Sequence, residues 1–169
     1  MRSALFIRGG WEGHQPVECT DLFAEILRKE GFAVDCSETL RVLENAERVA
    51  TYSVIVLCWT MGEISEDQVH TLLDTIRGGA GIAGWHGGMG DAFRTNCEYQ
   101  FMVGGQFVAH PGGIIPYTVE IVANNHPITQ GISTFSLTSE QYYMHTDPSN
   151  EVLAVTRISG TDAPWVTGC

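Results

Sequence analysis

The feature that most constrains the fold is an alternation of short apolar runs with amphipathic segments in the N-terminal part of the chain. The clearest run, YSVIVLCW at 52–59, is almost entirely apolar, as expected of a parallel strand covered on both faces. Runs at 3–10, 32–37 and 81–85 also have the length of strands, and amphipathic stretches separate them. This alternation predicts a doubly wound α/β domain with a mainly parallel sheet.

Helix-end signals support the same division. Thr20 is placed as the N-cap of a helix over 20–30 that ends at Gly31. Its expected inward face carries four apolar residues, Leu22, Phe23, Ile26 and Leu27. SEDQ at 65–68 has the pattern of a capping box. It predicts a helix that ends at Gly78-Gly79, and further helical segments are predicted over 40–50 and about 91–103.

The pattern changes after residue 105, where loops with two His-Pro pairs connect strand-like runs. The alternating run YTVEIVA at 117–123 predicts an antiparallel or edge strand, and EVLAVTRI at 151–158 predicts another strand. Neither an internal repeat nor a low-complexity linker interrupts the sequence. We therefore expect a single domain over residues 1–169.

Composition excludes several classes of function. The formal net charge is −11 with only nine Lys and Arg residues, so nucleic-acid and anionic-membrane partners are not expected. No apolar run reaches the roughly 18 residues that a membrane-spanning helix needs. The N-terminus lacks the pattern of a secretory signal. The five cysteines are scattered without a CxxC pair, which favours a reducing compartment. We expect a cytoplasmic protein.

The stretch GIAGWHGG at 81–88 places His86 between an apolar run and a pair of glycines. A residue at such a strand-to-helix turn is held rigidly and exposed at the carboxyl edge of the sheet. An imidazole there can act as a general base, a nucleophile or a metal ligand. It can equally serve only to cap the following helix. Position alone does not decide between these interpretations.

Other candidates lie in the loops that the same edge would carry. GGWEGHQP at 9–16 contains His14 but lacks the spacing of a dinucleotide-binding fingerprint. His110 and His126 each precede a proline, which restricts them to extended backbone. The cluster SEQYYMH contains an acid, two phenols and an imidazole, which suit sugar hydroxyls or proton transfer. Its members are Glu140, Tyr142, Tyr143 and His145.

Five motifs in order, GGWEGHQP, GGAGIAGWHGG, MVGGQFVAHPGG, NNHPITQGI and SEQYYMH, resemble the ThuA-like (trehalose-utilisation) proteins of the class I glutamine amidotransferase-like superfamily. The resemblance runs from residue 3 to about residue 158. It implies a flavodoxin-like three-layer α/β sandwich and a role in disaccharide or keto-sugar catabolism. In amidotransferase relatives a cysteine nucleophile occupies the turn where this chain has His86. Glutaminase chemistry is therefore not expected.

The resemblance also implies a further strand after the PWVTGC region, whereas this chain ends at Cys169. We accordingly expect a short or truncated variant that lacks the closing strand. An exposed sheet edge favours self-association, so a homo-oligomer is expected.

The leading hypothesis is a sugar-metabolism enzyme with acid/base chemistry on a keto-sugar. Its expected catalytic residues are His86, His14 and Glu140, and its expected sugar-binding residues are Trp11, His110, Tyr142 and Tyr143. One alternative is a metal-dependent hydrolase in which His14, His86 and His110 bind zinc or another divalent metal. Another is a non-catalytic sugar-binding or amidotransferase-like subunit. In the leading hypothesis no cofactor is required, and the partner is a small sugar.

Overall fold

The computed structural model describes residues 2–158 and 166–168. The chain forms two compact units, Met1–Val103 and Gly104–Cys169. The prediction of a single domain stays a prediction. The expectation about a missing closing strand concerns the chain end, most of which lies outside the described residues.

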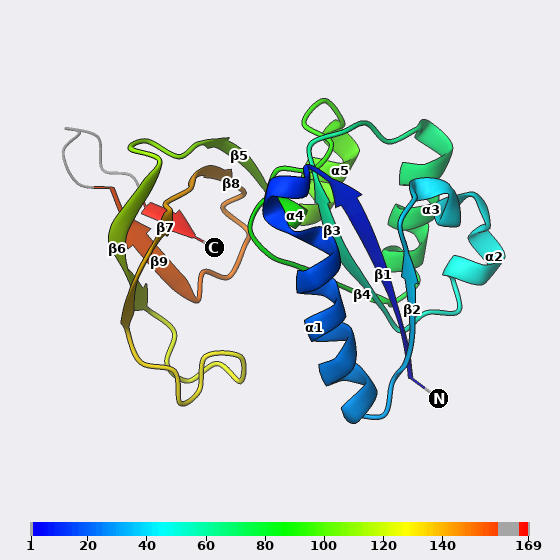
Figure 1. Cartoon of the computed structure of the whole chain (residues 1–169), viewed down its shortest axis with the longest axis horizontal. Helices are drawn as coiled ribbons and strands as arrows, with labels where there is room; N and C mark the ends of the chain where they lie inside the picture. Colours follow the sequence, from blue (N-terminus) through cyan, green and yellow to red (C-terminus); the bar gives the residue numbers. More distant parts are fainter. Residues whose placement is uncertain (1, 159–165, 169) are drawn as a thin grey trace. The chain divides into compact units, whose positions relative to one another are not determined.

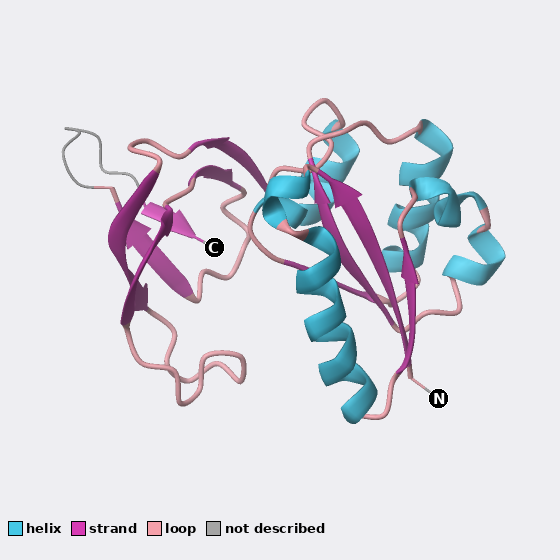
Figure 2. Cartoon of the chain, viewed as in Figure 1, coloured by secondary structure: helices cyan, strands magenta, loops and turns pink. Residues whose placement is uncertain are grey.

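The first unit is built on a four-stranded parallel sheet with the order β2-β1-β3-β4 (Figures 1 and 2). Its strands are β1 (Ser3–Gly10), β2 (Ala33–Ser37), β3 (Val54–Thr60) and β4 (Gly81–Gly84). The connecting helices are η1 (Glu12–His14), α1 (Pro16–Lys29), η2 (Leu40–Glu44), α2 (Ala46–Val49), α3 (Glu66–Arg77), α4 (Gly87–Gly90) and α5 (Cys97–Val103). The predicted parallel α/β fold is confirmed.

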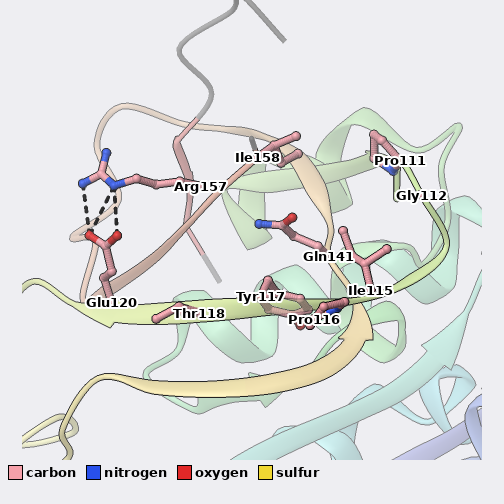
Figure 3. Close-up of a pocket in the computed structure, with 10 residues that line it drawn as sticks. All are labelled: Pro111, Gly112, Ile115, Pro116, Tyr117, Thr118, Glu120, Gln141, Arg157 and Ile158. Atoms are coloured by element: carbon pink, nitrogen blue, oxygen red, sulfur yellow. Dashed lines mark hydrogen bonds and ion pairs between the residues drawn. The ribbon is translucent and has the colours of Figure 1, made fainter. Parts of the chain in front are cut away.

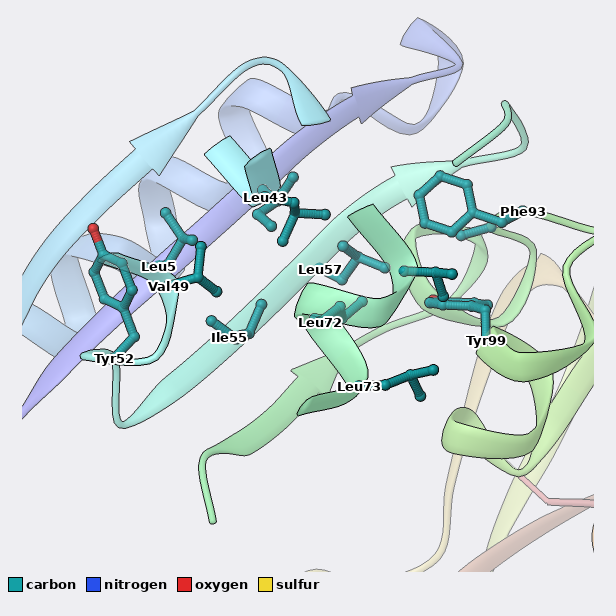
Figure 4. Close-up of a cluster of buried hydrophobic side chains, with 13 residues drawn as sticks. Leu5, Leu43, Val49, Tyr52, Ile55, Leu57, Leu72, Leu73, Phe93 and Tyr99 are labelled. Carbon is teal, nitrogen blue, oxygen red and sulfur yellow. The ribbon is translucent and has the colours of Figure 1, made fainter. Parts of the chain in front are cut away.

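The sheet is covered on both faces because successive side chains of a strand point to opposite sides. Leu5 and Ile7 of β1 belong to the larger hydrophobic cluster, together with residues of η2, α2 and α3 (Figure 4). Ala4 and Phe6 of the same strand belong to a second cluster that contains Ala24 of α1. The near-continuous apolar runs in β1 and β3 thus serve two cores.

Helix α1 differs from its prediction at its start and in its buried face. It begins at Pro16, and the hydroxyl of Thr20 donates a hydrogen bond to the Pro16 carbonyl at 2.6 Å, so Thr20 lies within the helix. The side chains of α1 that lie against the sheet are small, namely those of Thr20 and Ala24, and both are buried. Three of the four residues expected to face inward are instead exposed, namely Leu22, Phe23 and Ile26. Small residues let the helix lie close to β1, which periodicity alone does not reveal.

Helix α5 is shorter than the predicted 91–103. Residues 91–93 are not helical, because the Met61 N–H donates to the Asp91 carbonyl and the Phe93 N–H donates to the Met61 carbonyl. These bonds form a parallel bridge beside the end of β3. A tertiary hydrogen bond therefore overrides the local helical pattern. The predicted capping box of α3 is confirmed, with both reciprocal bonds between Ser65 and Gln68 present.

The second unit is antiparallel. β6 (Ile114–Ile121) lies in a sheet of order β10-β9-β6-β7, and β5 pairs with β8. The remaining bounds are β5 (Gly105–Ala109), β7 (Phe135–Glu140), β8 (Tyr143–Thr146), β9 (Ala154–Arg157) and β10 (Val166–Gly168). β6 and β9 match the two strands predicted for this region, and their antiparallel pairing agrees with the alternating pattern of 117–123.

In the part of the chain that the structure describes, no helix has the length and apolar character needed to cross a membrane.

The core assignment yields a stability prediction. Leu72 is fully buried in the larger cluster, whereas Leu22 is 58% exposed on α1. We expect Leu72→Ala to lower the free energy of unfolding by about 2–5 kcal/mol, because it leaves a cavity. Leu22→Ala, the same change on an exposed helix surface, should alter it by less than about 0.5 kcal/mol. Urea denaturation of both variants measures the difference, and similar losses would contradict the assigned core.

Candidate functional site

The candidate site of the first unit lies at the carboxyl ends of the parallel strands, where ligands bind in doubly wound folds. β1 leads through Gly9-Gly10 into η1, β3 ends at Thr60, and β4 leads through Trp85 to His86. Histidine side chains from two of these loops meet there.

His86 occupies a strained turn. It immediately precedes α4 with φ 51° and ψ −138°, a conformation that costs a residue other than glycine about 1–3 kcal/mol. The side chain is exposed. The predicted position at a strand-to-helix elbow is confirmed, and α4 is a single turn of four residues. Its side chain makes no capping hydrogen bond to that helix, so simple capping does not explain the histidine.

Two glycines make the elbow sterically feasible. A Cβ on Gly84 would lie 2.6 Å from Met89 Cβ and 2.8 Å from the Leu57 carbonyl oxygen. A Cβ on Gly88 would lie 2.9 Å from Cys58 Cα. Real Cβ atoms do not approach other atoms this closely, so any larger residue would push the turn away from β3. The glycines two residues before and after His86 therefore fix its place above the sheet.

His14 lies beside His86. Their ring centroids are 4.8 Å apart with an interplanar angle of 78°. Nδ1 of His14 is 2.8 Å from the hydroxyl oxygen of Thr60, and the buried Thr60 side chain thereby orients the ring. Trp11 packs edge-on against His14 at 4.7 Å and remains 48% exposed. The unit thus places two oriented imidazoles and an accessible indole together.

The close approach of β1 to β3 explains why the first loop begins with glycine. Gly10 has φ 81°, and a Cβ there would lie 2.1 Å from the carbonyl oxygen of Thr60. Thr60 was not among the residues singled out from the sequence. Its only signal was its position at the end of the apolar run, at the same edge as His14 and His86.

Neither Cys58 nor Cys97 is placed at the elbow as a reactive thiol. Cys58 lies under the elbow, and burial raises the pKa of its thiol to about 11, so the thiol stays protonated at neutral pH. Cys97 is exposed at the start of α5, ten residues or more along the chain from the elbow.

The second unit contains an aromatic and acidic cluster. Nε2 of His110 is 3.8 Å from a carboxylate oxygen of Glu140. The His110 ring stacks on Tyr142 at 6.3 Å with an interplanar angle of 22°, and it lies 5.9 Å from Phe107. Tyr142 is buried. The predicted residues His110, Glu140 and Tyr142 therefore gather within this unit, and they are joined by Phe107, which no sequence pattern singled out.

The other candidates lie elsewhere. Tyr143 packs edge-on against His145 at 5.9 Å and pairs in register with Ala109. His126 accepts a hydrogen bond at Nδ1 from the Ile128 N–H, as expected for a turn-capping histidine.

Only part of the predicted metal-ligand set lies within one unit. His14 and His86 offer two imidazole nitrogens on the first unit, whereas His110 belongs to the second. Neutral imidazole is a ligand that zinc prefers, but a catalytic zinc site has three protein ligands. The pair fits part of such a site, and metal binding stays a prediction.

A parallel β2-β1-β3-β4 sheet with helices on both faces defines a doubly wound α/β protein, and in this chain a strained elbow follows β4. The solved structure of a ThuA-like protein from Bacteroides uniformis is similar over 100% of this chain and 74% of its own, with 18% identity and a TM-score of 0.78. A glutamine amidotransferase from Thermotoga maritima is similar over 91% and 67%, with 15% identity and a TM-score of 0.54. These likenesses show the fold.

The family model of ThuA, described as trehalose utilisation, matches residues 3–168. The chain belongs to the ThuA family, as the five motifs predicted. Membership supports a role in carbohydrate utilisation. No curated protein matches the sequence significantly.

The elbow packing can be tested with two glycines of the same strand. Gly84→Ala should destabilise the protein by about 1–3 kcal/mol, because the added methyl group overlaps Met89 and Leu57. Gly81→Ala is the matched control, since its Cβ would meet its nearest neighbour, Val54, at 3.6 Å, an ordinary contact. Thermal unfolding should separate the two variants. Equal melting temperatures would show that the elbow tolerates a side chain there.

The raised pKa of Cys58 predicts selective alkylation. In the native protein at pH 8, iodoacetamide should modify exposed Cys36 and Cys97 and spare Cys58. The pKa of Cys58 is higher in the folded protein than in the unfolded chain. The contribution of this thiol to the free energy of unfolding is therefore complete below about pH 9 and is lost as the pH rises toward 11. Mass spectrometry of native and urea-unfolded samples identifies the modified thiols. Rapid modification of native Cys58 would contradict its assigned burial.

Proposed function

We propose that the protein is an enzyme of carbohydrate utilisation in which His86 transfers a proton to or from a sugar. The observation that carries the proposal is the strained elbow, which presents the His86 imidazole at the carboxyl edge of the sheet beside His14. A costly backbone conformation that exposes a titratable side chain is characteristic of functional sites. Membership in a family described as trehalose utilisation supports a sugar as the substrate.

Keto-sugars suit this chemistry because a carbon next to a carbonyl group loses a proton more readily than other sugar carbons. An imidazole exchanges protons near neutral pH and is the commonest general acid or base in enzymes. His86 would take that proton, and His14, oriented by Thr60, would donate to or accept from a substrate oxygen. Isomerisation or elimination would follow. The exposed Trp11 indole would pack against the sugar ring.

In the second unit, we propose that His110 and Tyr142 bind sugar through their stacked rings and that Glu140 provides a carboxylate for hydroxyl groups. The 3.8 Å approach of His110 to Glu140 supports a shared polar surface. Direct participation of Glu140 in proton transfer, and sugar binding by Tyr143, stay sequence-based predictions.

A metal-dependent hydrolase is the second candidate, and the adjacent imidazoles of His14 and His86 favour it. Such a protein would use a bound divalent metal to activate water. Elemental analysis of protein purified without chelator tests this candidate directly, because the metal must be present in stoichiometric amount. A metal content that His14→Ala and His86→Ala both abolish would support it over metal-free proton transfer.

Proton exchange at carbon provides the test of the leading proposal. The wild-type protein is incubated in D2O with a keto-disaccharide derived from trehalose, and NMR follows deuterium incorporation next to the carbonyl group. We expect His86→Gly to reduce the rate about 100-fold or more, as for loss of a general base. Glycine tolerates the positive φ of the elbow, so this variant preserves the backbone. Added imidazole should partly restore exchange in this variant.

His70 provides the matched control, because it is an exposed histidine in the middle of α3. His70→Ala should retain the wild-type exchange rate, and Thr60→Val should reduce the rate less than loss of His86 does, since it removes only the hydrogen bond that orients His14. Unchanged exchange in folded His86→Gly would refute the proposed role of His86. Absence of exchange in the wild-type protein would refute the reaction.

A further inference from the structure

The second unit contains a cavity of about 520 Å³ (Figure 3). None of the residues proposed above for catalysis lines it. The volume lies within the range of about 300–1,000 Å³ that is common for small-ligand sites. The loop before β6, β6 itself, the end of β9 and the residue after β7 form its walls. Its lining includes Pro111, Ile115, Tyr117, Glu120, Gln141 and Arg157.

Gln141 is the unusual group in this cavity. The residue is only 3% exposed, and its side chain points into the cavity (Figure 3). Its Nε2 atom has no hydrogen-bond partner among the described residues. A buried amide without a partner is destabilising, and native proteins rarely retain one unless water or a ligand satisfies it. The amide therefore indicates a bound oxygen atom.

The neighbouring Glu140 side chain belongs to a different environment. Its carboxylate approaches His110, whereas the side chain of Gln141 lines the cavity. The hydroxyl of Tyr117 donates to the Glu140 carbonyl oxygen at 3.4 Å, which anchors the Tyr117 ring in the cavity wall. The cavity is thus distinct from the His110 cluster, although consecutive residues contribute to both.

The charges in the wall cancel each other. Nε and Nη2 of Arg157 donate to the Glu120 carboxylate at 3.1–3.2 Å, so the cavity carries no net charge from this pair. The hydrogen bonds to Glu120 use only Nε and Nη2 of Arg157. Its Nη1 atom makes no hydrogen bond to a described residue and can donate to a ligand oxygen. A neutral ligand matches this wall better than an anion does.

We propose that this cavity of the second unit binds a neutral saccharide through residues that take no part in the proposed chemistry of His86. Gln141 and Arg157 supply donors for hydroxyl or ring oxygens, and Tyr117, Ile115 and Pro111 supply apolar surface for the C–H face of a sugar ring. The choice of a saccharide rests on the proposed function in carbohydrate utilisation. The existence of a ligand site rests on Gln141 and the cavity alone.

The test uses the full-length protein and trehalose as the probe. Titration followed by amide NMR should show saturable shifts at residues 111–120, 141 and 157. We expect Gln141→Leu to weaken trehalose binding about three- to tenfold, as for loss of one neutral hydrogen bond. The same variant should raise the melting temperature of the free protein, because leucine removes an unsatisfied buried amide without leaving a cavity. A purely structural glutamine would not give both effects.

Gln130→Leu is the matched control, since Gln130 is an exposed glutamine of the same unit, and it should leave trehalose binding unchanged. The titration is repeated in His86→Gly protein, so that binding is measured without turnover and a failure of the proposed reaction is distinguishable from a failure here. Shifts that do not saturate, or equal affinity in Gln141→Leu, would overturn the proposal. Binding of glucose 6-phosphate in preference to trehalose would also overturn it, because it would require a cationic wall.

Discussion

The contact between Gly88 and Cys58 is the constraint on which the geometry of the first unit depends. Because a Cβ on Gly88 would reach within 2.9 Å of Cys58 Cα, α4 can lie directly on β3 only as a glycine-rich turn. That contact buries the Cys58 thiol and keeps it protonated. His86, the residue directly before this turn, has a positive φ and an exposed side chain. The close approach of a helix to a strand therefore lies beside both a buried cysteine and an exposed histidine.

The sequence predicted this part well because its signals are local. Gly84, His86 and Gly88 lie within five residues, and the apolar runs of β1 and β3 show directly that both of their faces are buried. Prediction failed where a distant partner decided the structure. Residues 91–93 look helical but bond to Met61, and α1 turns its small residues inward because the sheet lies close. Three further features depend on tertiary neighbours. They are the hydrogen bond of His14 to Thr60, the cluster around His110, and the buried amide of Gln141, which has no hydrogen-bond partner among the described residues.

Two features that reduce the stability of the molecule lie at the proposed sites. The positive φ of His86 is a cost in the backbone, and the Nε2 atom of Gln141, which has no hydrogen-bond partner among the described residues, is a cost in desolvation. Neither is needed for the fold, since glycine would relieve the first and leucine the second. The first cost supports the proposed site of proton transfer, and the second supports the proposed site for a neutral ligand.

The residues that determine the shape of the elbow are not the residue whose side chain it exposes. Its shape is determined by Gly84, Gly88 and the strands beneath them, and the side chain at position 86 contributes almost nothing to that shape. A single codon change at this position can therefore replace one reactive group with another without rebuilding the scaffold.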